Sequence, residues 1–124
     1  MIRPDDAVWE ERPNQQGQLR RLVDLTAAGE LTQSRARIWR YPPHTRGRRH
    51  AEGVQEEVFV VLEGRTTLFL GDPPEAVELG PGSVAVVEPG TAVQVANRSG
   101  DDATVFIIGA PPEQGAADYL PDAG

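Results

Sequence analysis

RRHAEGVQEEVFVVLEG, residues 48–64, is the stretch of sequence that decides the fold. A histidine and three glutamates stand before a run of β-branched, aromatic and other apolar residues, and Gly64 follows soon after the run. Short apolar runs of this kind, bounded by polar and turn residues, are typical of strands. The stretch therefore predicts a strand that begins with polar side chains. These side chains form a metal site, the remnant of a metal site, or a group that is simply solvated.

The same pattern of short apolar runs continues on both sides of this stretch. Gly-Asp-Pro-Pro (71–74), Gly-Pro-Gly (80–82), Pro-Gly (89–90) and Ser-Gly-Asp-Asp (99–102) punctuate the chain. Turn signals at a spacing of roughly 8–12 residues are typical of an antiparallel sandwich or barrel. Only residues 19–29 could hold a helix, with Thr26 as its cap, and a short strand or loop fits them equally well.

Composition excludes several classes of function. The chain has 124 residues, 39% of them hydrophobic, which suits one globular domain. A net charge of −7 disfavours nucleic acid and anionic membranes as partners. The absence of cysteine excludes disulfides and thiolate sites, and the absence of lysine excludes Schiff-base chemistry. Without a long apolar stretch or a leader sequence, we expect a cytoplasmic protein.

Two motifs with fixed spacing extend outward from the opening stretch. The first motif has four positions: His50, Glu52, Glu57 and Gly64. The second runs from Gly82 through Glu88, Pro89 and Gly90 to Val93 and Asn97. Together they closely resemble the two motifs of the cupin superfamily, G-x5-H-x-H-x3–4-E-x6-G and G-x5-P-x-G-x2-H-x3-N. The resemblance covers approximately residues 34–110.

The resemblance implies an all-β fold, the cupin-type double-stranded β-helix or jelly-roll barrel made of two antiparallel sheets. It also implies a metal centre at four positions, of which this chain keeps two, His50 and Glu57. Glu52 stands where the family has its second histidine, and Val93 stands where it has the third. His44 falls on the first glycine of the family pattern, and Glu88 replaces a proline. The resemblance thus points to a degenerate metal site.

Strand parity indicates how these residues converge. Side chains two residues apart on a strand share a face, so His50 and Glu52 point the same way. If that face is the barrel interior, Glu57 and Val93 meet them there from neighbouring strands. We predict that the metal ligands are His50, Glu52 and Glu57, and that the divalent metal is absent or weakly bound. Such a ligand set favours manganese, iron or magnesium over zinc or copper.

A second set of residues is predicted to bind a small-molecule ligand. Arginines crowd the turn before His50 and the strand before that turn, where guanidinium groups would suit a carboxylate or phosphate. Aromatic residues there could stack a ring or sugar, and apolar residues would line the cavity. The predicted ligand-binding residues are Arg37, Trp39, Tyr41, Arg48, Phe59, Val61, Val93 and Val95. The alternative is that the arginines are solvated or pair with glutamates, and parity leaves open which row of residues 35–41 faces inward.

These observations leave two main classes of function. The first, which we favour, is a small-molecule-binding cupin with a weakened or absent metal site. The alternative is a metal-dependent cupin enzyme using iron or manganese, such as a dioxygenase or isomerase, whose small substrate can be anionic. A metal-free epimerase or lyase with His50 as its base is a third possibility.

The predicted organisation is a single domain. We expect an N-terminal segment (1–33) that packs on the barrel, the cupin barrel itself (34–112) and a polar C-terminal tail (113–124), in which Tyr119 and Leu120 anchor the tail. Apolar residues on both faces of the VFVVL strand exceed what one interior can absorb. We therefore expect a homodimer.

Overall fold

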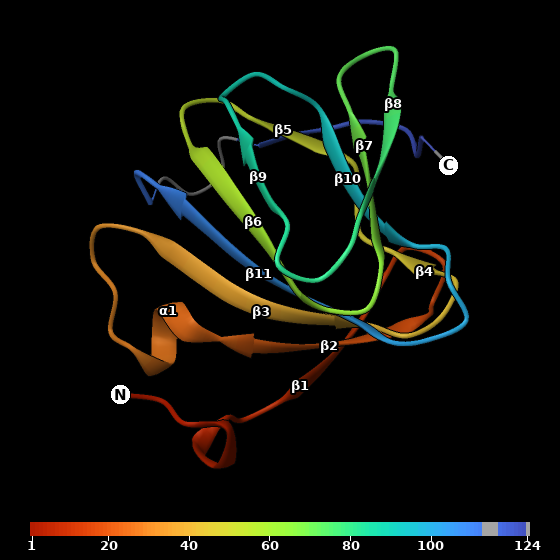
Figure 1. The fold of residues 1–124 in the computed structure, drawn as a ribbon. Coiled ribbons are helices and arrows are strands. Elements are labelled where there is room, and N and C mark those ends of the chain that lie inside the picture. The colour runs from red at the N-terminus through yellow and green to blue at the C-terminus, as the bar shows by residue number, and fades with distance from the viewer. Residues whose placement is uncertain (113–116, 124) are drawn as a thin grey trace.

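The structure is a computed structural model that describes residues 1–112 and 117–123. The described residues form two antiparallel sheets that face one another across a shared interior (Figure 1). In sheet A the strand order is β1-β2-β3-β11-β6-β9, and in sheet B it is β12-β5-β10-β7-β8, with β4 paired to β10. The predicted all-β barrel is confirmed.

The elements are short, as the turn spacing predicts. Sheet A consists of β1 (Glu10–Pro13), β2 (Leu19–Asp24), β3 (Arg35–Tyr41), β6 (Glu56–Glu63), β9 (Val84–Val87) and β11 (Ala103–Ala110). Sheet B consists of β4 (Thr45–Arg46), β5 (His50–Glu52), β7 (Thr66–Leu70), β8 (Glu75–Leu79), β10 (Val93–Asn97) and β12 (Ala117–Tyr119). The described helical elements are the 3₁₀-helix η1 (Pro4–Asp6) and α1 (Leu25–Ala28). No helix in the described part of the chain is long and apolar enough to cross a membrane.

The opening stretch joins the two sheets, because β5 lies in sheet B and β6 in sheet A. Along β6 the burial alternates, so Glu57, Phe59 and Val61 face inward while the residues between them are more exposed. Gly64 ends this stretch with φ of +72°, and a Cβ atom there would collide with the backbone of Asp102. Glycine is needed at this turn for both reasons.

The N-terminal segment takes part in sheet A. Residues 19–29, for which helix and strand were equally compatible, contain both β2 and α1. The cap of α1 is Asp24, whose side chain accepts from the backbone N–H of Ala27 at 3.2 Å. The prediction of Thr26 as the cap was wrong, because its hydroxyl is bonded to the backbone of Ala36 instead. β2 then pairs with β3 and widens the sheet that bounds the interior.

Part of the C-terminal tail lies along sheet B. β12 pairs with β5 so that Tyr119 is the partner of His50. The backbone N–H of Leu120 donates to the carbonyl of Arg49 at 3.0 Å, and the Arg48 guanidinium lies 3.7 Å from the centroid of the Tyr119 ring. These contacts hold the tail against the strand that carries His50. Residues 113–116 and 124 of the predicted tail lie outside the described residues.

The interior between the sheets is an apolar core. Its central side chains come from both sheets and are at most 8% exposed: Leu22, Trp39, Tyr41, Phe59, Leu68, Val87, Val93, Val95 and Val105. Burying side chains of this size contributes about 1.5–3 kcal/mol each. This cluster is the main source of stability for a chain whose only described α-helix has four residues.

The outer face of sheet A is apolar where β6 and β9 pair. Val84 and Val86 on β9 are 60% and 62% exposed, and they pair with the outward-facing Val60 and Val58 of β6. An exposed apolar patch of this kind is a candidate interface, and a second copy related by a two-fold axis would present the same patch to it. The predicted homodimer remains a prediction, and this face is where we expect it to form.

Replacing Val86 with lysine tests this expectation. The charge would have to be buried in the interface, so light scattering should give a dimer for the wild type and mostly a monomer for Val86→Lys. Val54→Lys is the matched control, because Val54 is also exposed (45%) but lies in the loop between β5 and β6. A wild type that stays monomeric at all accessible concentrations would refute the dimer.

Candidate metal and ligand site

Three polar side chains meet at the junction of the two sheets. His50 and Glu52 come from β5 and lie on one face of that strand, and Glu57 begins the inward row of β6. His50 Nε2 lies 3.2 Å from Glu57 Oε1 and 3.6 Å from Glu52 Oε1. One possible ligand atom from each residue lies within 4.8 Å of the others. The group is therefore compact enough to hold a metal ion.

The orientation of His50 suits such a role. Its Nδ1 lies 3.1 Å from the backbone carbonyl of Arg48. A carbonyl only accepts hydrogen bonds, so Nδ1 carries a proton and donates. Nε2 is then the atom that faces the two carboxylates, either as a second N–H donor or as a lone pair for a metal. A backbone carbonyl that fixes the tautomer in this way is the usual support for a metal-binding histidine.

The charges in this group influence one another. Burial lowers the pKa of His50, but the hydrogen bond to Glu57, the bond to the Arg48 carbonyl and the two negative charges outweigh it, so that the pKa is raised above 6.5. Burial, followed by the charge of Glu57, raises the pKa of Glu52. Without metal, the imidazolium form of His50 compensates the crowded carboxylates.

Val93 occupies the place where the cupin motif has another histidine. It is the direct partner of His50 across β5 and β10, and its side chain is 1% exposed within the apolar core. An isopropyl group donates no lone pair. The donor set of one imidazole and two carboxylates still fits a divalent ion that accepts oxygen ligands and water, as manganese, iron(II) and magnesium do.

A cavity of about 720 Å³ opens beside the polar group. Both sheets contribute to its wall, which combines the three polar residues with aromatic, apolar and basic side chains. Six of the predicted ligand-binding residues line it: Arg37, Trp39, Tyr41, Arg48, Phe59 and Val95. Val61 and Val93 are 1% exposed and are not part of the lining. The row of β3 that faces the cavity is thus the one with Arg35 and Trp39.

Sequence reasoning missed several residues of this wall. Arg12, Arg20 and Asn14 reach it from β1, β2 and the loop between them, Ile107 from β11 and Ala117 from β12. No local signal marks them, because their position depends on pairing between segments far apart in the chain. Of these residues, only Arg20 could have been identified, by assigning residues 19–24 to a strand with alternating burial.

Gln55 was also missed, and it shapes the cavity. It is 4% exposed, and its amide N–H₂ donates to the carbonyl of Pro111 at 3.0 Å. Its side chain fills the space above Gly109, where a Cβ atom would lie 2.5 Å from Gln55 Cδ and Oε1. Gly109 is therefore the position at which β11 leaves room for a polar side chain in the wall.

Comparisons with known proteins agree with this architecture. The family model described as "Cupin domain" matches residues 37–109. The chain belongs to the cupin family. No curated protein sequence matches the chain.

Solved structures show the same fold at low sequence identity. A predicted oxalate decarboxylase from Thermotoga maritima has a TM-score of 0.77 and 16% identity, covering 89% of this chain and 97% of that one. A sugar phosphate isomerase from Silicibacter pomeroyi has a TM-score of 0.76 and 19% identity over 100% and 94%. The polyketide cyclase RemF from Streptomyces resistomycificus has a TM-score of 0.80 and 18% identity over 98% and 85%. At these identities the likeness shows the fold alone.

The raised pKa of His50 can be measured directly. In protein treated with a chelator, NMR titration of the His50 ring should give a pKa above 6.5, and Glu57→Gln should lower it because the strongest raising contact is lost. Because the pKa of His50 is higher in the folded than in the unfolded protein, protonation of its ring stabilises the fold. This contribution is complete below the pKa of the unfolded state and disappears as the pH rises through the pKa of the folded state. Equal pKa values in wild type and Glu57→Gln would contradict the assigned contact.

Proposed function

We propose that this cupin is a small-molecule-binding protein whose metal site is weakened. The observation that carries the proposal is the cavity. Its volume of about 720 Å³ is in the range of small-molecule sites, about 300–1,000 Å³. Its wall joins aromatic and apolar side chains to a few polar groups that converge on one point, which is the composition expected of a ligand site.

The weakness of the metal site follows from the ligand count. Three residues with possible ligand atoms remain. Val93, at the position where the cupin motif has its third histidine, has no ligand atom in its side chain and is buried. Loss of partners that only orient a ligand already lowers metal affinity about 10–100-fold, so loss of a ligand should cost more. In addition, the proton on His50 must leave before Nε2 can bind a metal. Both effects favour a site that is mostly free of metal.

Similar structures support small-molecule chemistry on this fold by analogy only. The three above are described as a decarboxylase, an isomerase and a cyclase. A metal-dependent enzyme would need His50, Glu52 and Glu57 to hold iron or manganese tightly without further protein ligands. Metal-independent binding of a small molecule makes no such demand on these three residues. We therefore favour a binding protein over a metal-dependent enzyme.

A cavity-blocking variant tests ligand binding. Ile107 lines the cavity from β11, so Ile107→Trp should fill it, while Ile108→Trp places the same ring on the other face of the same strand. We expect small-molecule fragments detected by saturation-transfer NMR to bind the wild type and Ile108→Trp but not Ile107→Trp. A fragment set that binds all three proteins alike, or none, would remove the cavity from consideration as the site.

Metal content tests the second half of the proposal. Elemental analysis of the purified wild type should give well below one equivalent of divalent metal. Val93→His should raise the manganese or iron content if the backbone still suits a fourth ligand, and adding His50→Ala should abolish that gain. Val93→Leu controls for the change in core volume. Stoichiometric metal in the wild type, lost on His50→Ala, would instead establish the metal-dependent enzyme.

A further inference from the structure

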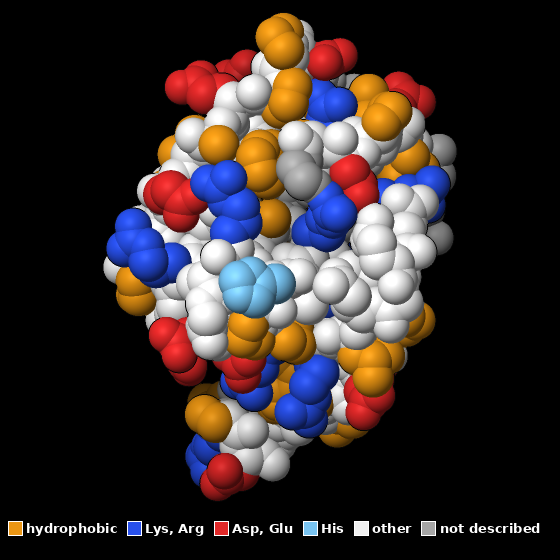
Figure 2. Space-filling model, turned by 90° about the vertical axis from the view of Figure 1, so that its right-hand side faces the viewer, with side chains coloured by type: hydrophobic (Ala, Val, Ile, Leu, Met, Phe, Trp, Pro, Cys, Tyr) orange, Lys and Arg blue, Asp and Glu red, His pale blue; other side chains and the backbone are white. Residues whose placement is uncertain are grey.

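The cavity is basic although the protein is acidic. Five arginines line it, against two glutamates, in a chain with a net charge of −7: Arg12, Arg20, Arg35, Arg37 and Arg48. On the outer surface seen in Figure 2, basic and acidic side chains are interspersed. The concentration of one sign in a concave site attracts ligands of the opposite charge, here anions.

Other arginines near the cavity already have structural partners. Arg46 Nε lies 3.5 Å from Asp122, and Arg49 bonds to Asp72 and to the carbonyls of Gly71 and Pro121. These contacts fasten the tail and a turn, so Arg46 and Arg49 are not available to a ligand.

Arg35 and Arg37 differ from these residues. Among the described residues neither side chain has a hydrogen bond or an ion pair within 4.0 Å, and both are only partly exposed. They lie two positions apart on β3 and so share the inward face. Burial, followed by the charge of Arg35, lowers the pKa of Arg37. Asp24 lies opposite Arg37 on β2 and its charge raises that pKa, but its carboxylate caps α1 and makes no ion pair with Arg37 within 4.0 Å among the described residues. Two neighbouring cations without a paired carboxylate are costly, and a bound anion would offset that cost.

Arg20 completes the basic wall from β2. It is 8% exposed, and its guanidinium carbon lies 4.5 Å from the Trp39 ring centroid and 5.9 Å from that of Tyr41. One terminal N–H donates to the carbonyl of Pro13, while its Nε has no partner among the described residues. Stacking on Trp39 fixes the plane of the guanidinium and so pre-organises its donors.

We propose that Arg37, together with Arg35, forms a subsite for the oxyanion of a small organic acid, either a carboxylate or a phosphate, and that Arg20 extends the basic wall farther along the strands. The assignment rests on the proposed small-molecule site and specifies its ligand class. A guanidinium matches the geometry of both oxyanions through paired N–H donors. The ligand is therefore an acid and not a neutral or cationic molecule.

The position of the acidic group defines the other end of the ligand. In sheet A, Glu57 and Arg35 flank Gly109 on neighbouring strands, and Phe59 and Arg37 flank Ile107 in the next row. Two strand spacings separate the backbones of each row by about 9.5 Å. An acid held by the arginines thus directs its remaining atoms across Ile107 toward Glu57. A hydroxyl or ammonium group there would donate to the carboxylates.

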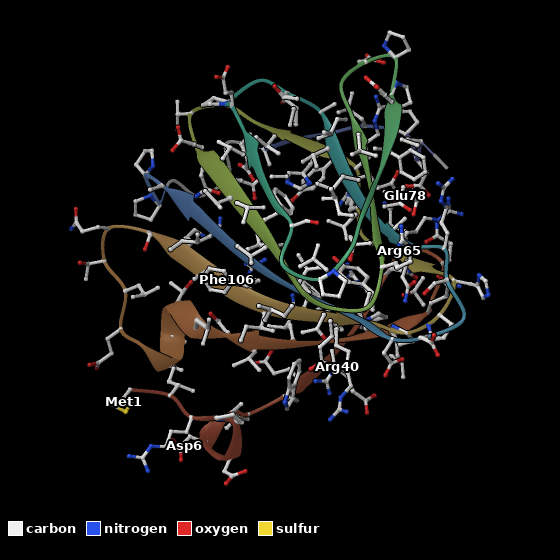
Figure 3. All side chains as sticks on the ribbon, in the orientation of Figure 1. Met1, Asp6, Arg40, Arg65, Glu78 and Phe106 are labelled. Carbon is white, nitrogen blue, oxygen red and sulfur yellow. The ribbon has the colours of Figure 1, made fainter. Side chains whose placement is uncertain are left out.

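Binding of simple anions to two matched variants tests the subsite. Arg37→Met removes the charge inside the cavity, and Arg40→Met removes it on the same strand outside the barrel, where Arg40 lies against Trp9 and away from the interior (Figure 3). The probes are inorganic phosphate and succinate, with neutral succinamide as a control, at constant ionic strength. We expect the Kd of phosphate, of succinate or of both to rise by about tenfold or more in Arg37→Met and to change less than about twofold in Arg40→Met. The probe that responds distinguishes the phosphate from the carboxylate.

NMR of the arginine Nε–Hε groups gives a second readout. The Arg35 and Arg37 signals should shift when the anion is added, and the Arg40 signal should not. If Arg37→Met does not fold, Arg35→Gln takes its place with the same expectation. Equal loss of affinity in both variants, anion binding equal to that of succinamide, or no anion binding at all would overturn the subsite. In each case, fragments that bind the wild type but not Ile107→Trp would leave the proposed function intact.

Discussion

The pairing of β11 with β3 on one side and β6 on the other is the constraint on which the site depends. β11 pairs with β3 from Ala103 opposite Tyr41 to Gly109 opposite Arg35, and it pairs with β6 in regular register from Val105 opposite Val61 to Gly109 opposite Glu57, after one irregularity between Thr104 and Val105. Val105, in the middle of β11, is completely buried and fixes this register through the core. A shift by one residue would turn the arginines of β3 outward and bring their apolar neighbours into the cavity. The opposition of basic and acidic groups is thus a consequence of strand register.

The polar group at the junction of the two sheets can exist in two mutually exclusive states, one with a proton on His50 Nε2 and one with a metal ion there. In the metal-free protein, the protonated His50 offsets part of the negative charge of Glu52 and Glu57 and is itself held by the Arg48 carbonyl. With a metal, the same nitrogen would give up its proton and the ion would supply the positive charge. The group therefore needs a cation in either state, and histidine provides one without any cofactor. The weak metal binding that we propose is therefore compatible with retention of this group.

The sequence predicted what depends on local order, and failed where distant segments meet. Turn spacing indicated an antiparallel sandwich or barrel, and the resemblance to the cupin motifs implied the two-sheet barrel and, together with strand parity, the meeting of His50, Glu52 and Glu57. A strand assignment for residues 19–24 could have indicated that Arg20 is buried, but its place in the cavity wall requires β2 to pair with β3. Spacing could not separate Arg37 from Arg40, since parity defines two faces without saying which is inside. Gln55 was hidden for a related reason: its space exists only because residue 109, more than fifty positions later, is glycine.

The two tryptophans of the chain lie on opposite sides of sheet A. Trp39 is buried (8% exposed) at the cavity wall beneath Arg20, whereas Trp9 lies outside, 4.3 Å from the Arg40 guanidinium. Trp39 is covered by Arg20, and Trp9 by both Arg40 and Arg21, but only Trp39 borders the space that a ligand would fill. The intrinsic fluorescence of the protein consequently has an inner and an outer source, and the inner emission alone reports directly on the occupancy of the barrel.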